Sequence, residues 1–136
     1  MNRVFVDTNV FLRFFTRDDA GHHERAKGLF ESAAEGKVEL VTGPPVLFEV
    51  YWTLVSGYKH KVQDALDVIE SILNQRGITL TDTRLVEDAV TLARRKGGEF
   101  ADAYIYALAR SQKCDSVATF NEKDFRALGA DVASEL

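Results

Sequence analysis

The chain has 136 residues, of which 46% are hydrophobic and 28% are charged, as in ordinary soluble globular proteins with a real core. Its formal net charge of −4 argues against a general nucleic-acid coat, which is normally basic, but not against an enzyme that acts on nucleic acid. The single Cys114 excludes an internal disulfide, and Asp7 breaks the short apolar run at the N-terminus. We therefore expect a cytoplasmic protein without a signal peptide or a membrane span.

In the first half of the chain, short β-branched or aromatic runs alternate with longer segments of helical periodicity. A buried strand is predicted at 3–6, and a short helix over 10–15 follows, with Thr8 or Asn9 able to cap it. Next come a helix within 18–37, a strand at 38–43, a helix that starts at the pair Pro44 and Pro45, and an amphipathic helix within 62–77.

The second half continues the alternation. It comprises a strand at 78–80, a helix within 81–98 capped by Thr81 or Asp82, a helix at 100–112, a strand at 115–119, a short helix at 122–128 and an edge strand at 130–133. Such alternation favours a mostly parallel sheet covered by helices through right-handed crossovers. We predict one α/β domain over residues 1–136, a three-layer fold in which helices sandwich four to five parallel strands.

Three acidic residues stand where the pattern calls for other residue types. Asp7 ends a buried strand, Glu49 interrupts the apolar run PPVLFEVYWTLV, and Asp102 lies in FADAYIYALA. Because the helical neighbours of Glu49 are mostly apolar, we expect its carboxylate to leave bulk water. Each residue alone also has an ordinary reading: a cap for Asp7, an exposed or ion-paired helix residue for Glu49, and a first-turn residue that favours the helix dipole for Asp102.

If the three carboxylates converge, their mutual repulsion requires relief by a cation or by protonation. At an effective dielectric constant near 20, two unit charges about 5 Å apart repel by roughly 3 kcal/mol. Three such pairs cost about 10 kcal/mol, which is comparable with the whole stability of a domain. Hard carboxylate oxygens without His or Cys in the pattern favour Mg²⁺ or Mn²⁺ over zinc. Such an ion can ionise a water and stabilise charge on a phosphate.

Four segments carry a resemblance to a known family: VFVDTNVFLRFF, PPVLFEVYWTL, GGEFADAYIYALA and VATFNEKDF. In this order they resemble the motifs of the PIN-domain family, and among its members the VapC-type toxins of bacterial and archaeal toxin–antitoxin pairs. The resemblance covers nearly the whole chain. It implies a parallel sheet sandwiched by helices and an Mg²⁺- or Mn²⁺-dependent endoribonuclease, which cleaves an RNA phosphodiester with a metal-activated water. It also implies a small antitoxin partner and a homodimer.

The resemblance also implies roles for individual residues. Asp7, Glu49 and Asp102 would be the catalytic, metal-binding acids, and Thr8 and Thr119 would support them by hydrogen bonding. Asn9, which completes the DTN run, is a further supporting candidate.

One position departs from the family pattern. The family often has a fourth aspartate directly after TF, where this chain has Asn121. An amide oxygen can still ligate a metal or its water, but it brings no charge. Asp124, three residues further on, is either an auxiliary site residue or an early helix residue that pairs with Lys123 or Arg126. Both readings stay open.

Basic residues near the motifs are candidates for contact with RNA phosphates, although a solvated helix end is the more usual explanation of such residues. They are Arg13, Arg17, Arg94 and Arg95. Among other functions, an aspartyl phosphatase is disfavoured because it needs a second Asp two residues after the first, where Asn9 stands. A non-catalytic PIN-like scaffold that binds RNA or protein is the remaining alternative, and Asn121 is the feature that favours it.

Overall fold

The structure, a computed structural model, describes residues 1–134 and divides into two compact units. The first unit is Met1–Thr83 and the second is Arg84–Leu136. The elements along the chain are β1 (Asn2–Phe5), α1 (Thr8–Thr16), α2 (Ala20–Ala34), β2 (Val38–Thr42), α3 (Pro44–Trp52), a π-helical turn η1 (Thr53–Gly57), α4 (Val62–Leu73), β3 (Ile78–Leu80), α5 (Thr83–Lys96), α6 (Phe100–Ser111) and α7 (Glu122–Leu128). The expectation of one domain over residues 1–136 stays a prediction.

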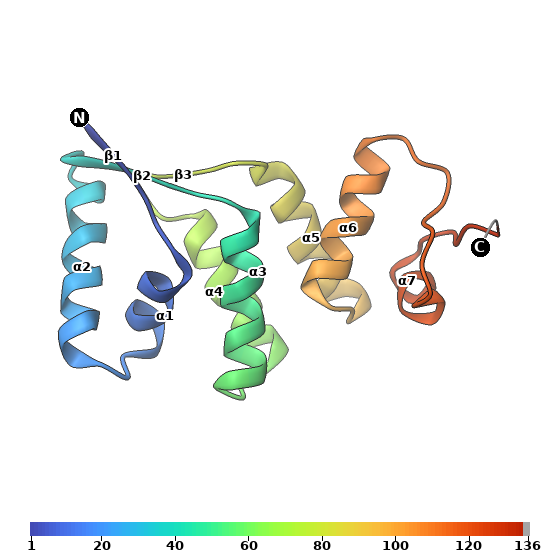
Figure 1. Cartoon of the computed structure of the whole chain (residues 1–136), viewed down its shortest axis with the longest axis horizontal. Helices are drawn as coiled ribbons and strands as arrows, with labels where there is room; N and C mark the ends of the chain where they lie inside the picture. The colour runs from blue at the N-terminus through green and yellow to red at the C-terminus, as the bar shows by residue number, and fades with distance from the viewer. Residues whose placement is uncertain (135–136) are drawn as a thin grey trace. The chain divides into compact units, whose positions relative to one another are not determined.

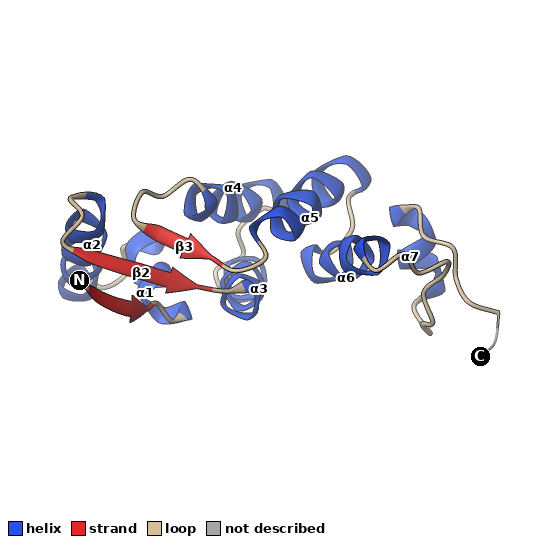
Figure 2. Ribbon diagram, turned by 90° about the horizontal axis from the view of Figure 1, so that it is seen from above, coloured by secondary structure: helices blue, strands red, loops and turns tan. Residues whose placement is uncertain are grey.

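The sheet of the first unit is parallel, as predicted, with the strand order β1-β2-β3. Val4 lies opposite Leu40, which in turn lies opposite Ile78, so these side chains share one face of the sheet. Each crossover leads to the next strand in the same direction, and right-handed crossovers therefore place all their helices on one face. Figure 1 shows α1, α2, α3 and α4 together on one side of the strands, and Figure 2 views the same strands from above.

The number of strands differs from the prediction. The sheet has three strands among the residues that the structure describes, where four to five were expected. Segments 115–119 and 130–133 instead meet each other in a single parallel bridge, Val117 to Val132. These valines are the only β-branched residues with apolar side chains in the two segments, and Ser116 and Ala118 beside Val117 are exposed. Too little apolar area is present to hold longer strands.

The helices of the first unit lie together on one face of its sheet (Figure 1). On the other face Phe5 is 63% exposed, and Arg3 pairs with Glu39 directly across the register (Nε–Oε2 3.2 Å).

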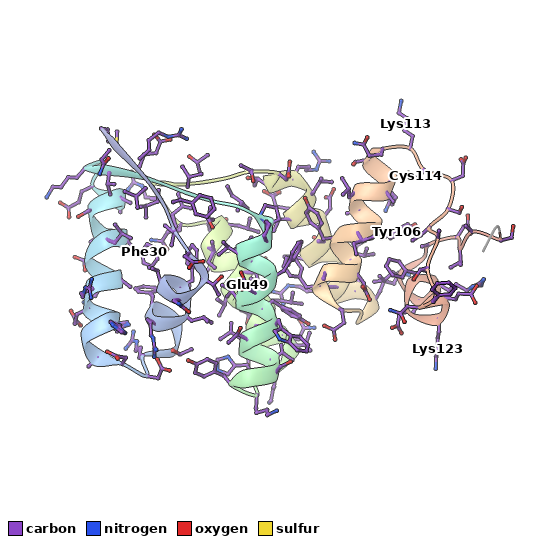
Figure 3. The ribbon with its side chains drawn as sticks, in the orientation of Figure 1. Phe30, Glu49, Tyr106, Lys113, Cys114 and Lys123 are labelled. Carbon is purple, nitrogen blue, oxygen red and sulfur yellow. The ribbon has the colours of Figure 1, made fainter. Side chains whose placement is uncertain are left out.

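Aromatic side chains join α1 and α2 beneath the sheet. The ring of Phe30 stacks on Phe11 with 5.6 Å between centroids and meets Phe14 edge-on at 4.9 Å. Figure 3 shows Phe30 pointing from α2 towards α1. Leu40 on β2 and Leu47 on α3 are also fully buried. Burying each such side chain contributes about 1.5–3 kcal/mol to the stability of the fold. This packing stabilises the positions of the helices against the sheet.

The second unit has its own apolar core. Its buried side chains include Val86, Val90, Phe100, Ala103, Tyr104, Phe125 and Leu128. The hydroxyl of Tyr106 on α6 donates to the carbonyl oxygen of Gly129, directly after α7 (3.0 Å, Figure 3). This bond and the buried aromatic rings connect α6 with α7. None of the helices over residues 1–134 combines the length and apolar character that a membrane crossing requires.

Asp18 connects the end of α1 with η1. Its carboxylate accepts hydrogen bonds from the hydroxyl of Tyr58 (2.6 Å), the hydroxyl of Thr16 (3.0 Å) and Nη1 of Arg13 (3.0 Å). Chiefly through the Tyr58 bond, these donors lower the pKa of Asp18 from its ordinary value of 3.8 to about 2.

We expect Asp18→Asn to destabilise the protein at neutral pH and to matter less in acid. Because the pKa of Asp18 is depressed on folding, its carboxylate contributes stability above the unfolded value of 3.8 and loses it as the pH falls through about 2. Urea midpoints of wild type and variant at pH 7 and pH 2 measure this. An equal difference at both pH values would contradict the assignment. Asp64→Asn, at an exposed position in α4, is the matched control.

Candidate functional site

Asp7 lies at the carboxyl end of β1 and forms the N-cap of α1. Its Oδ1 accepts a hydrogen bond from the backbone N–H of Thr8 (2.8 Å). The prediction that Thr8 or Asn9 caps this helix is therefore wrong by one or two residues, because the aspartate carboxylate itself accepts from the unpaired N–H. Asp7 is exposed although Val6 before it is buried, so its charge needs no buried partner.

Thr8 links this cap to Glu49. Its side chain is almost fully buried, and its Oγ1 donates to Oε1 of Glu49 (3.2 Å). One residue therefore holds two carboxylates, Asp7 through its backbone N–H and Glu49 through its hydroxyl. The two acids are 42 positions apart in the sequence, and the tertiary fold brings them together.

The pairing of β1 with β2 explains this approach. The N–H of Val6 donates to the carbonyl oxygen of Val41 (2.8 Å), and the buried hydroxyl of Thr42 donates to the carbonyl oxygen of Val6 (3.1 Å). These bonds align the carboxyl ends of two neighbouring parallel strands, so α1 and α3 begin at the same edge of the sheet. Such an edge is where ligands bind in parallel α/β sheets.

Glu49 is exposed, so the expectation that its carboxylate leaves bulk water is wrong. The reason is the helix face on which it lies. Pro45, Glu49 and Trp52 are spaced by four and three residues and form one exposed stripe of α3, where Trp52 is 65% exposed. Pro45 and Trp52 thus face solvent together with Glu49, while Val46, Leu47 and Val50 are buried in the core. Figure 3 labels Glu49 on α3.

Asp102 and Asp124 form a second acidic pair, in the second unit. Asp102 lies half-buried in the first turn of α6, and Asp124 lies in the first turn of α7. Partial burial, and after it the charge of Asp124, raise the pKa of the Asp102 carboxyl. The expected pairing of Asp124 with Lys123 or Arg126 is not found within residues 1–134, since Arg126 pairs with Glu122 instead (Nη2–Oε1 3.5 Å).

Thr119 and Asn121 shape the turn that leads into α7. The hydroxyl oxygen of Thr119 accepts from the backbone N–H of Asn121 (3.0 Å). Asn121 occupies the N-cap of α7, but its side chain makes no capping bond there. It is exposed, so its amide remains accessible beside the helix that carries Asp124.

The candidate basic residues lie in different settings. Arg13 is engaged by Asp18, and it borders a cavity of about 500 Å³ between α1 and α2 that Asn9 also lines. Arg17 is exposed and ends α1 in the left-handed conformation, with φ 57°. Arg94 is half-buried, whereas Arg95 is exposed and lines a groove of the second unit.

Each unit thus holds two of the four acids. Neither unit, over residues 1–134, brings together three or more His, Cys, Asp or Glu side chains that could hold a metal ion. In the first unit Asp7 and Glu49 offer exposed carboxylates anchored on one threonine, and in the second Asp102 lies near Asp124. These are hard oxygen donors without nitrogen or sulfur ligands, a set that suits Mg²⁺ or Mn²⁺.

Three comparisons relate the chain to known proteins. The family model described as PIN domain matches residues 4–130. The chain is 26% identical over 124 residues to the VapC ribonuclease of Aquifex aeolicus (strain VF5), and the alignment covers 91% of this chain and 90% of that protein. It is also similar to a crystal structure of the sarcin-ricin loop cleaving toxin VapC20 of Mycobacterium tuberculosis, with 25% identity, a TM-score of 0.43, and coverage of 96% of this chain and 98% of that one.

Proposed function

This chain belongs to the PIN domain family, and from that premise we propose that it is a metal-dependent endoribonuclease, the toxin of a type II toxin–antitoxin pair. The observation that carries the proposal is the pair of carboxylates, Asp7 and Glu49, that Thr8 holds at the carboxyl edge of the sheet. The similarity to a VapC ribonuclease over most of both chains supports it. Because one family model spans residues 4–130, we also propose a single PIN domain.

In this proposal the carboxylates of Asp7, Glu49 and Asp102 are the metal-binding acids of an Mg²⁺- or Mn²⁺-dependent reaction. When bound, such a cation supplies Lewis acidity towards a phosphate and lowers the pKa of a water at the site. The chemistry of the donors supports this choice, since all three side chains end in hard oxygens. Partial burial, and after it the charge of Asp124, raise the pKa of the Asp102 carboxyl, and a nearby cation would act in the opposite direction.

Other residues of the site position these acids. Thr8 orients Glu49 by its hydroxyl and the Asp7 carboxylate by its N–H. Thr119 holds the turn at Asn121. The amide oxygen of Asn121 is a candidate neutral ligand for the metal ion or for a water bound to it. Asp124 acts as an auxiliary acid, which its influence on the pKa of Asp102 supports.

The substrate in this proposal is an RNA phosphodiester, with Arg13, Arg17, Arg94 and Arg95 as candidates for contact with its phosphates. Asn9, exposed at the start of α1, is a further candidate beside the acids. We place the activity in the cytoplasm, in a homodimer restrained by a small antitoxin. The exposed indole of Trp52 on α3 supports an apolar contact surface for such a partner, whereas Tyr51 belongs to the core.

Incubation of purified, antitoxin-free protein with total RNA tests the proposal. We expect cleavage with millimolar Mg²⁺ or Mn²⁺ and none with EDTA, because the reaction depends on the cation. Products resolved on a denaturing gel give the readout. Cleavage that persists in EDTA would indicate another mechanism, and RNA binding without cleavage under either cation would favour the non-catalytic scaffold.

A further inference from the structure

A groove between α5 and α6 in the second unit is lined largely by polar and basic side chains. Its volume is about 490 Å³. The side chains that matter here are Arg84, Asp88, Thr91, Arg95, Arg110 and Ser111. Of these, only Arg95 is a candidate on sequence grounds, because Arg84 and Arg110 join it only when the two helices lie side by side.

The groove face of α5 is a separate stripe from its core face. Arg84, Asp88, Thr91 and Arg95 are spaced by four, three and four residues, which places them on one side of the helix. The buried positions of α5 lie on another side: Val86, Ala89, Val90 and Ala93. At 1.5 Å per residue, the polar stripe extends for about 16 Å, long enough to follow several atoms of an extended ligand.

The groove is positively charged in an acidic protein. Three guanidinium groups and one carboxylate give its lining a net charge of +2, whereas the whole chain carries −4. Arg84 lies 3.6 Å from Asp88 in an exposed pair, which solvent screens and a ligand can replace. The side chain of Arg95 has no hydrogen-bond or ion-pair partner among residues 1–134.

Two further contacts leave donors and acceptors available in the groove. The Arg110 guanidinium lies over the ring of Tyr106, 5.6 Å from its centroid, which steadies the group without occupying its N–H donors. The Ser111 hydroxyl donates to the carbonyl oxygen of Leu108 (2.7 Å), so the lone pairs of Ser111 Oγ remain to accept a hydrogen bond.

We infer that this groove binds the sugar–phosphate backbone of the RNA substrate, an inference that rests on the proposed ribonuclease function. Guanidinium groups match phosphate oxygens with paired N–H donors, and the Ser111 oxygen can accept from a ribose 2′-hydroxyl. Asp102 lies on the same helix as Arg110, eight residues or about 12 Å earlier along its axis. RNA held in the groove therefore passes near one of the proposed catalytic acids.

Helix dipoles alone do not explain these arginines. Arg95 and Arg110 lie in the last turns of α5 and α6, where positive charge is favourable in any helix. Arg84, however, is the second residue of α5, where the dipole disfavours a cation. A phosphate ligand accounts for all three positions.

The test is binding of a fluorescently labelled 20-nucleotide single-stranded RNA to the full chain, followed by anisotropy in EDTA at several salt concentrations. We expect Arg84→Ala, Arg95→Ala and Arg110→Ala each to weaken binding and to reduce the log–log salt slope by about 0.7, the value for one lost phosphate contact on a single strand. Arg95→Lys keeps the charge and should retain the slope. Arg76→Ala, an exposed arginine of the first unit, is the matched control and should leave both quantities unchanged.

Several results would overturn the inference. The inference fails if the groove variants bind RNA as tightly as wild type. It also fails if Arg76→Ala loses as much RNA affinity as the groove variants do. Binding of polyglutamate, but not RNA, with the same arginine dependence would assign the groove to an acidic peptide instead. Thermal melts identify any variant that fails to fold, and Arg95→Gln, which removes the charge but keeps most of the side chain, then replaces Arg95→Ala in the test. Wild-type RNA cleavage together with arginine-independent binding would refute only the groove, whereas arginine-dependent binding without any cleavage would refute only the ribonuclease.

Discussion

Asp7→Asn and Asp102→Asn are each expected to lower the rate of RNA cleavage by more than about 100-fold. Mutation of a residue that only supports a metal ligand already lowers metal affinity or activity by about 10–100-fold. Both changes remove a charge while nearly preserving side-chain shape. Asn is as good an N-cap as Asp, so Asp7→Asn should keep α1 intact and separate the chemical role of Asp7 from its capping role. Initial cleavage rates with Mg²⁺ and thermal melts of the same samples give the two readouts.

The matched control for this experiment is Asp64→Asn. It makes the same chemical change in the first turn of α4, at an exposed position in the same unit as Asp7. We expect it to cleave RNA at the wild-type rate. If Asp7→Asn retained activity within a few-fold of wild type, Asp7 would be a structural cap and nothing more.

Mn²⁺ is expected to stabilise the protein against unfolding. The melting temperature measures this effect without any assay of activity. A ligand that binds only the folded state adds about 2.7 kcal/mol at a concentration of 100 times its Kd. Asp7 and Glu49, both held by Thr8, supply two carboxylates for the ion. Melting temperatures at rising Mn²⁺ concentration measure the effect.

Two comparisons make this measurement specific. Potassium chloride at matched ionic strength controls for general screening of the −4 net charge. Asp7→Asn and Glu49→Gln should lose most of the stabilisation. An unchanged melting temperature at millimolar Mn²⁺, or an equal rise in Asp7→Asn, would exclude a cation site at these carboxylates.

Local periodicity was sufficient to predict most of the elements. The strand Ile78–Leu80 and the helix Glu122–Leu128 match their predicted ranges, and the α/β class and parallel sheet are confirmed. Such features depend on neighbouring residues in the sequence, where period and turn residues are directly visible. The failed strands at 115–119 and 130–133 show the limit, because a strand also requires a partner with enough apolar area to pair along its length.

By itself, the sequence determined that acidic residues follow or interrupt apolar segments, and hence which side chains are candidates for chemistry. Only the tertiary structure decided what those side chains touch. The bond from Thr8 to Glu49 and the exposed stripe of α3 depend on contacts across 41 residues and on the angle of a helix against its sheet. The groove of Arg84, Arg95 and Arg110 likewise requires two helices to lie side by side. Packing between distant segments sets such contacts, and no spacing within one segment encodes them.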